Sequence, residues 1–144
     1  MPTIVAYRYD NDRYEVGDII TPKRDSFGSL TLAQQKVETA LRAAIPDGHA
    51  LRGGSVFAWE SEAVAKWVWP YSGKLYLYEL EILEADIKFR GDLNHYNNAA
   101  DAAALDFPFD HHIEAYRTGA PSPDNGLPRI ELLFSKAKVL KRDE

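Results

Sequence analysis

The chain has 144 residues, of which 45% are hydrophobic and 27% are charged, so its length and composition predict one globular domain with a core of its own. Its 22 acidic and 17 basic residues give a formal net charge of -5. This charge argues against a protein that mainly coats nucleic acid, although a local basic groove stays open. The sequence has no cysteine, which excludes disulfides, a thiolate nucleophile and cysteine-ligated zinc.

The N-terminal residues lack a basic region followed by an apolar one, and no apolar run reaches the roughly 18 residues of a membrane helix. We therefore expect no membrane partner. The expected location is the cytoplasm, or a target-cell cytoplasm reached without a cleavable signal peptide.

The N-terminal third predicts a strand followed by a helix. Residues 3–9 are rich in β-branched and aromatic side chains and form the expected strand, and residues 18–20 form a short extended piece. Residues 23–29 are polar and predict an exposed loop. Thr31 and Gln34 then fit a capping box at the start of a helix, whose apolar residues recur at helical spacing as far as Ile45.

The middle third predicts two strands with a helix between them. Gly53 and Gly54 precede an apolar strand over residues 55–59, and flexibility before that strand is the expected role of the two glycines. Ser61 is the expected cap of a helix that Pro70 ends. A strand follows over residues 74–84, with Tyr76, Tyr78, Leu80 and Ile82 on one face.

The C-terminal third predicts a strand near residues 87–90, a helix capped by Asn94 and a second helix over residues 110–118. A loop at residues 119–128 leads to two closely spaced strands, residues 130–134 and 137–140. Clustered strands with interspersed helices, without regular βαβ alternation, predict the α+β class.

Several common chemistries have no signature in this sequence. It contains no glycine-rich phosphate loop, no dinucleotide-binding fingerprint and no nucleophile elbow. The adjacent histidines His111 and His112 lack the spacing of a zinc-binding helix. We therefore expect no metal cofactor.

Three short segments form a pattern: Tyr7-Arg8 lies in the first strand, Ser55 begins the strand that runs directly into a helix, and Glu131 lies in a late strand. Together they resemble the ADP-ribosyltransferase fold, and in particular its small bacterial and phage-type members with an Arg-Ser-Glu pattern. The resemblance implies a single domain over residues 1–144, with a split, mainly antiparallel β core flanked by helices. It also implies that NAD is the substrate.

The resemblance assigns a role to each of these three residues. Arg8 would bind the phosphate or ribose side of NAD, where a guanidinium donates planar, paired hydrogen bonds. Ser55 would hold the nicotinamide ribose and position the glutamate. Glu131 would accept a hydrogen bond from the ribose 2′-hydroxyl and stabilise the positive charge that develops as nicotinamide leaves.

Further candidates surround these three. Tyr7, Phe57 and Trp59 are candidates for stacking on nicotinamide, and Arg52, shortly before the second strand, is a candidate phosphate ligand. Each candidate also has a plainer interpretation. Arg8 would then be a strand residue paired with an acid, Glu131 would face water, and Trp59 would belong to the core.

One position departs from the family pattern. Arginine-modifying toxins carry Glu or Gln two residues before the catalytic glutamate, and Arg129 stands there in this chain. This departure puts a protein-arginine acceptor in doubt. A basic side chain there is compatible with an anionic acceptor, such as a nucleic acid or a phosphorylated or acidic molecule.

The sequence thus predicts an NAD-dependent ADP-ribosyltransferase, toxin-like or effector-like, whose acceptor is an unidentified protein, nucleic acid or small molecule. An immunity or antitoxin protein is a further expected partner. The alternatives are an NAD glycohydrolase, a catalytically inactive binding or adaptor domain of the same fold, and an unrelated α+β scaffold.

Overall fold

The computed structural model describes residues 2–23, 25–122 and 127–144. The chain divides into two compact units, each built from segments that are separated in the sequence. A sheet unit contains residues 1–22, 55–89 and 131–144, and a helical unit contains residues 23–54 and 90–130.

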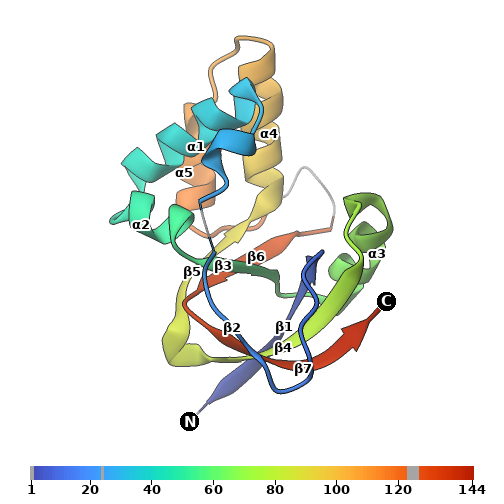
Figure 1. The fold of residues 1–144 in the computed structure, drawn as a ribbon. Helices are drawn as coiled ribbons and strands as arrows, with labels where there is room; N and C mark the ends of the chain where they lie inside the picture. The colour runs from blue at the N-terminus through green and yellow to red at the C-terminus, as the bar shows by residue number, and fades with distance from the viewer. Residues whose placement is uncertain (1, 24, 123–126) are drawn as a thin grey trace. The chain divides into compact units, whose positions relative to one another are not determined.

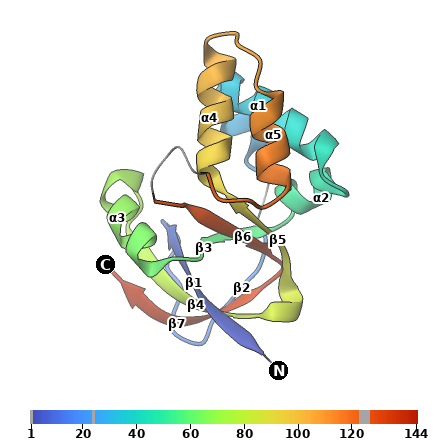
Figure 2. The same ribbon diagram turned by 180° about the vertical axis from the view of Figure 1, so that it is seen from behind.

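The described residues form a seven-stranded sheet and five α-helices, which confirms the α+β class (Figures 1 and 2). The strands are β1 (Thr3–Asp10), β2 (Ile19–Ile20), β3 (Val56–Trp59), β4 (Tyr76–Leu83), β5 (Ile87–Asp92), β6 (Ile130–Phe134) and β7 (Ala137–Asp143). Their order in the sheet is β2-β7-β4-β1-β3-β6-β5, and the sheet is antiparallel. The helices are α1 (Leu32–Ala44), α2 (Gly48–Gly53), α3 (Glu62–Ser72), α4 (Leu93–Ala104) and α5 (Asp110–Arg117), with short 3-10 turns at Phe27–Ser29 and Glu84–Asp86.

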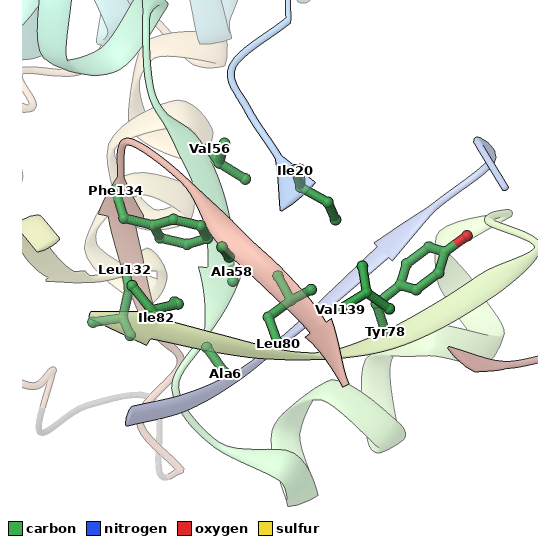
Figure 3. Close-up of a cluster of buried hydrophobic side chains, with 11 residues drawn as sticks. Ala6, Ile20, Val56, Ala58, Tyr78, Leu80, Ile82, Leu132, Phe134 and Val139 are labelled. Atoms are coloured by element: carbon green, nitrogen blue, oxygen red, sulfur yellow. The ribbon is translucent and has the colours of Figure 1, made fainter. Parts of the chain in front are cut away.

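The core of the sheet unit lies on one face of its strands, because alternate residues of a strand point to the same side. Figure 3 shows this cluster of side chains from six strands. The predicted apolar face of β4 is confirmed, since Tyr78, Leu80 and Ile82 are fully buried in the cluster. The other members are Ala6, Ile20, Val56, Ala58, Leu132, Phe134, Ala137 and Val139.

A buried ion pair joins three helices of the helical unit. Glu38 on α1 and Arg52 on α2 are 4% and 7% exposed, and two hydrogen bonds of 2.6 and 3.2 Å connect their side chains. The Arg52 guanidinium also donates to the hydroxyl of Tyr116 on α5 at 2.5 Å. These bonds offset the cost of removing both charges from water and fix α1, α2 and α5 to one another.

The predicted start of α1 is confirmed. The Thr31 hydroxyl accepts from the Gln34 backbone, and the Gln34 side chain accepts from the Thr31 backbone, so the capping box is complete.

The helix α2 was not predicted, because its flanking Gly and Pro residues resemble turns. Gly48 is required there, since a Cβ atom at that position would lie 2.4 Å from the Arg42 carbonyl oxygen.

Two predicted helix boundaries are wrong. Helix α3 continues past Pro70 to Ser72 and ends at Gly73, which adopts a left-handed conformation. A proline in the last turn removes only one backbone hydrogen bond, so the helix tolerates it. Helix α4 begins at Leu93 and is capped by Asp92, not by Asn94. In addition, β7 continues to Asp143, beyond the predicted end at residue 140.

Within the described ranges, no helix combines the length and the apolar character needed to cross a bilayer. Part of the predicted loop at residues 119–128 lies outside the described residues.

The buried pair gives a stability prediction. Replacing Glu38 with Gln would leave the Arg52 charge buried without its carboxylate, so we expect the free energy of unfolding to fall by about 3–5 kcal/mol. Urea denaturation followed by circular dichroism measures this change. Glu114→Gln is the matched control, because Glu114 pairs with Arg117 on the surface of α5 and exposed pairs contribute about 1 kcal/mol or less. Equal losses in the two variants would contradict this account.

Candidate functional site

A hollow of about 160 Å³ lies in the sheet unit where β1 and β3 separate. Strand β1 pairs with β4 over its whole length, but its described pairing with β3 is limited to Tyr7 opposite Trp59. Beyond that position, β1 and β3 leave room between them for side chains. The hollow is lined by Arg8, Tyr9, Phe57, Ala58, Trp59 and Glu131.

Arg8 reaches across the gap between the two strands. Its Nη1 atom donates to the Phe57 carbonyl oxygen at 2.7 Å, and its Nε atom donates to Asp10 Oδ2 at 3.3 Å. The first bond links the side chain of a β1 residue to the backbone of β3. Arg8 therefore helps to hold the two strands at their separation.

Glu131 lies opposite Trp59 in the pairing of β3 with β6, and each is less than a tenth exposed. The Tyr9 ring lies 6.1 Å from the Trp59 ring, measured between centroids, at an interplanar angle of 46°. One wall of the hollow is thus aromatic and another carries a buried carboxylate.

The sheet register places Arg8 and Glu131 on different faces. Directly paired residues share a face, so Tyr7, Trp59 and Glu131 lie together, whereas Arg8 follows Ala6 on the side of the core. Both side chains nevertheless line the same hollow. A cation and a carboxylate therefore border one space.

The volume of the hollow limits what it can hold. Sites for drug-sized ligands and cofactors measure about 300–1,000 Å³, and this hollow measures about 160 Å³. It has room for one ring-sized group and not for a whole dinucleotide.

The hollow brings together four of the predicted site residues, and two other candidates lie near it. Tyr7 is on β1, but its hydroxyl donates to Glu62 on α3 at 3.4 Å. Burial, with the nearby carboxylates of Glu62 and Glu79, raises the pKa of Tyr7 above its usual value. Ser55 precedes β3, and its Oγ atom is buried without a hydrogen-bond partner among the described residues. Neither residue lines the hollow.

Arg52 lies in the helical unit, where its guanidinium binds Glu38 and Tyr116. Its donors are engaged in this buried network, so Arg52 is a structural residue of the helical unit.

Sequence reasoning missed Tyr9, which also lines the hollow. The signal was present, because alternation along β1 places Tyr9 on the same face as Tyr7.

A second hollow, of about 300 Å³, lies in the helical unit beside Arg42 and His49. The Arg42 guanidinium forms two hydrogen bonds with Asp25 and one with Glu38. Hydrogen bonding from Arg42 to the Asp25 carboxylate is the main cause that lowers the pKa of Asp25 to about 2. Because the arginine is already neutralised by two carboxylates, this hollow offers little to an anionic ligand.

No protein-family model matches this chain, and no curated protein matches it. The family resemblance therefore stays a prediction. Within the part of the chain that the structure describes, no group of three or more His, Asp or Glu side chains could hold a metal ion.

The bridging role of Arg8 gives a second prediction. Arg8→Met keeps the aliphatic stem but removes both hydrogen bonds, so we expect the free energy of unfolding to fall by about 1.5–3 kcal/mol. Arg13→Met is the matched control, because Arg13 is exposed and pairs only at the surface; its expected cost is about 0.5 kcal/mol. Urea titration measures both. If the Arg8 variant is as stable as the native protein, Arg8 does not hold β1 to β3.

Proposed function

We propose that the hollow in the sheet unit is the catalytic end of an NAD site, and that the protein transfers ADP-ribose from NAD to an acceptor. The observation that carries this proposal is that Arg8 and Glu131, 123 positions apart in the sequence, line the same hollow with the aromatic rings of Tyr9, Phe57 and Trp59. Cation, carboxylate and apolar walls are the groups that this chemistry needs.

In the proposed reaction, the bond between ribose C1′ and the nicotinamide nitrogen breaks, and its electron pair stays with the nicotinamide ring. The ring loses its positive charge and the ribose becomes oxocarbenium-like. An acceptor nucleophile then forms a bond to C1′ and loses its proton. Glu131 would stabilise the developing charge on the ribose, and a carboxylate held on a buried strand needs little reorganisation to do so.

The dimensions of the hollow suit this division of roles. An aromatic amide such as nicotinamide would occupy the ring-sized space beside Trp59, while the remainder of the dinucleotide would lie outside it. A bound ring would displace water from this space, which would strengthen the interaction of Glu131 with a cation.

Arg8 and Ser55 would complete the site. Arg8 donates through its Nε and Nη1 atoms to Asp10 and Phe57. Among the described residues, Nη2 makes no hydrogen bond that would compete with a phosphate or ribose oxygen. The Ser55 hydroxyl has unused hydrogen-bonding capacity, and a buried hydroxyl without a partner costs about 1–3 kcal/mol. A ribose hydroxyl that reached Ser55 from the part of NAD outside the hollow would supply that partner.

A second candidate function is a binding or adaptor domain without catalysis. The observation that favours it is the contact of Arg8 with Phe57 and Asp10, because an arginine that holds two strands together needs no ligand. The acceptor of the transferase, whether protein, nucleic acid or small molecule, and any immunity or antitoxin partner remain part of the proposal.

The release of nicotinamide from NAD tests the proposed function. We expect purified protein, supplied with cell lysate as a source of acceptors, to release nicotinamide. Glu131→Gln should lower the rate at least about a hundredfold, because the carboxylate acts only on the charged transition state. Chromatography of the reaction mixture measures nicotinamide directly.

Glu81→Gln is the matched control, because Glu81 lies on β4 of the same sheet and does not line the hollow. It should leave the rate within about twofold. No release by folded native protein would refute the transferase and favour the binding domain. Incorporation of labelled ADP-ribose into lysate components separates transfer from hydrolysis.

A further inference from the structure

Asp92 is a fully buried carboxylate at the junction of β5 and α4. Its Oδ1 atom accepts from the backbone of Asn94 at 2.9 Å, which is the ordinary bond of a helix N-cap. The same Oδ1 accepts from the backbone of Arg129 at 3.1 Å, and Oδ2 accepts from the backbone of Ser122 at 2.8 Å. Two of the three bonds therefore reach a segment at least 30 residues away.

Helix capping alone does not explain this arrangement. A serine, threonine or asparagine at position 92 would also accept the bond from Asn94. A carboxylate has acceptor sites on both oxygens and can therefore receive three backbone N–H groups at once, two on Oδ1 and one on Oδ2. Burying such a charge is costly unless it is hydrogen-bonded, so the three bonds offset that cost together.

Neighbouring side chains of α4 hold other points of the same segment. The Asn94 amide donates to the Leu127 carbonyl oxygen at 3.1 Å. His95 Nε2 lies 2.8 Å from the Ala120 carbonyl oxygen, and since a carbonyl only accepts, Nε2 carries the proton.

Arg129 is held at both of its backbone groups. Its N–H donates to Asp92, and its carbonyl oxygen accepts from the Leu93 backbone at 2.8 Å. Arg129 stands two residues before Glu131 in the sequence, so the point at which the chain enters β6 is fixed.

The register of β6 decides where Glu131 lies. Glu131 is opposite Trp59 in the pairing of β3 with β6. Side chains alternate along a strand, so a slip of one residue would move Glu131 to the other face of the sheet. A fixed Arg129 would oppose such a slip, because it stands two residues before Glu131.

We infer that Asp92 is a positioning residue for Glu131: by holding the backbone of Arg129 and Ser122, it sets the register that places the Glu131 carboxylate in the hollow. The inference rests on the proposed function for its catalytic readout. Its structural readout, the protection of β6 backbone amides from hydrogen exchange, is independent of that function.

The test compares Asp92→Asn with two other variants. The asparagine keeps the shape and one acceptor oxygen, but its amide nitrogen cannot accept from Ser122. We expect kcat for nicotinamide release to fall about a hundredfold, as misplacement of a catalytic group by about 1 Å does, with KM for NAD within about twofold. Backbone amide exchange should become faster at Leu132 and Phe134 of β6 and stay unchanged on β4.

Asp110→Asn is the matched control, because Asp110 lies at the N-terminal end of α5, as Asp92 does at α4, but is exposed. It should change neither readout. Asn94→Ala removes only the side-chain bond to Leu127, so it should lower kcat by a smaller factor than Asp92→Asn. If Asp92→Asn does not fold, the effect of Asn94→Ala on kcat and on β6 amide exchange decides whether this anchor positions Glu131.

The failures of the two proposals are distinguishable. If native protein releases no nicotinamide, the proposed function fails, and amide exchange of β6 then decides the role of Asp92 alone. If Asp92→Asn speeds exchange at Ser122 and Arg129 but leaves β6 exchange unchanged, Asp92 only holds a loop and the inference is overturned. An unchanged kcat in folded Asp92→Asn that cleaves NAD also overturns it.

Discussion

The candidate site depends on one constraint, which is that β1 and β3 pair only at Tyr7 and Trp59 among the described residues. A sheet that continued its ladder there would bring the strands to the usual spacing of about 4.8 Å and leave no hollow. The Phe57 carbonyl oxygen instead accepts a hydrogen bond from the Arg8 guanidinium. The same arginine thus maintains the gap and supplies the positive charge beside it, which gives Arg8 two roles that mutation of the side chain must affect together.

The rest of the sheet unit supports that gap. The fully buried side chains of Leu80, Ile82 and Leu132 form the packed face shown in Figure 3. Tight packing of this kind leaves few alternative arrangements for the strands that it joins. Glu131 is carried on a strand whose residues are all buried, so its carboxylate has little freedom to move. Rigid support of this kind is what electrostatic stabilisation of a transition state requires.

The sequence predicted well those features that local chemistry controls. The capping box of Thr31 and Gln34, the apolar face of β4 and the strand at Glu131 were predicted because each depends on a few neighbouring residues. Helix α2 was missed because Gly48 and Gly53 resemble turn residues, whereas Gly48 is needed for close approach to Arg42. The role of Arg52 was missed for a related reason, since its partners Glu38 and Tyr116 are distant in the sequence. The gap beside Arg8 and the hydrogen bonds of Asp92 could not be predicted either, because both arise from pairings between distant segments.

The central claim is that the hollow receives the nicotinamide ring. The most direct test is a titration of isotope-labelled protein with nicotinamide, followed by NMR of the backbone amides. If the hollow receives the ring, the amides of Phe57, Ala58, Trp59 and Glu131 should shift together in a saturable manner. Shifts confined to other residues, or none at millimolar nicotinamide, would contradict the account.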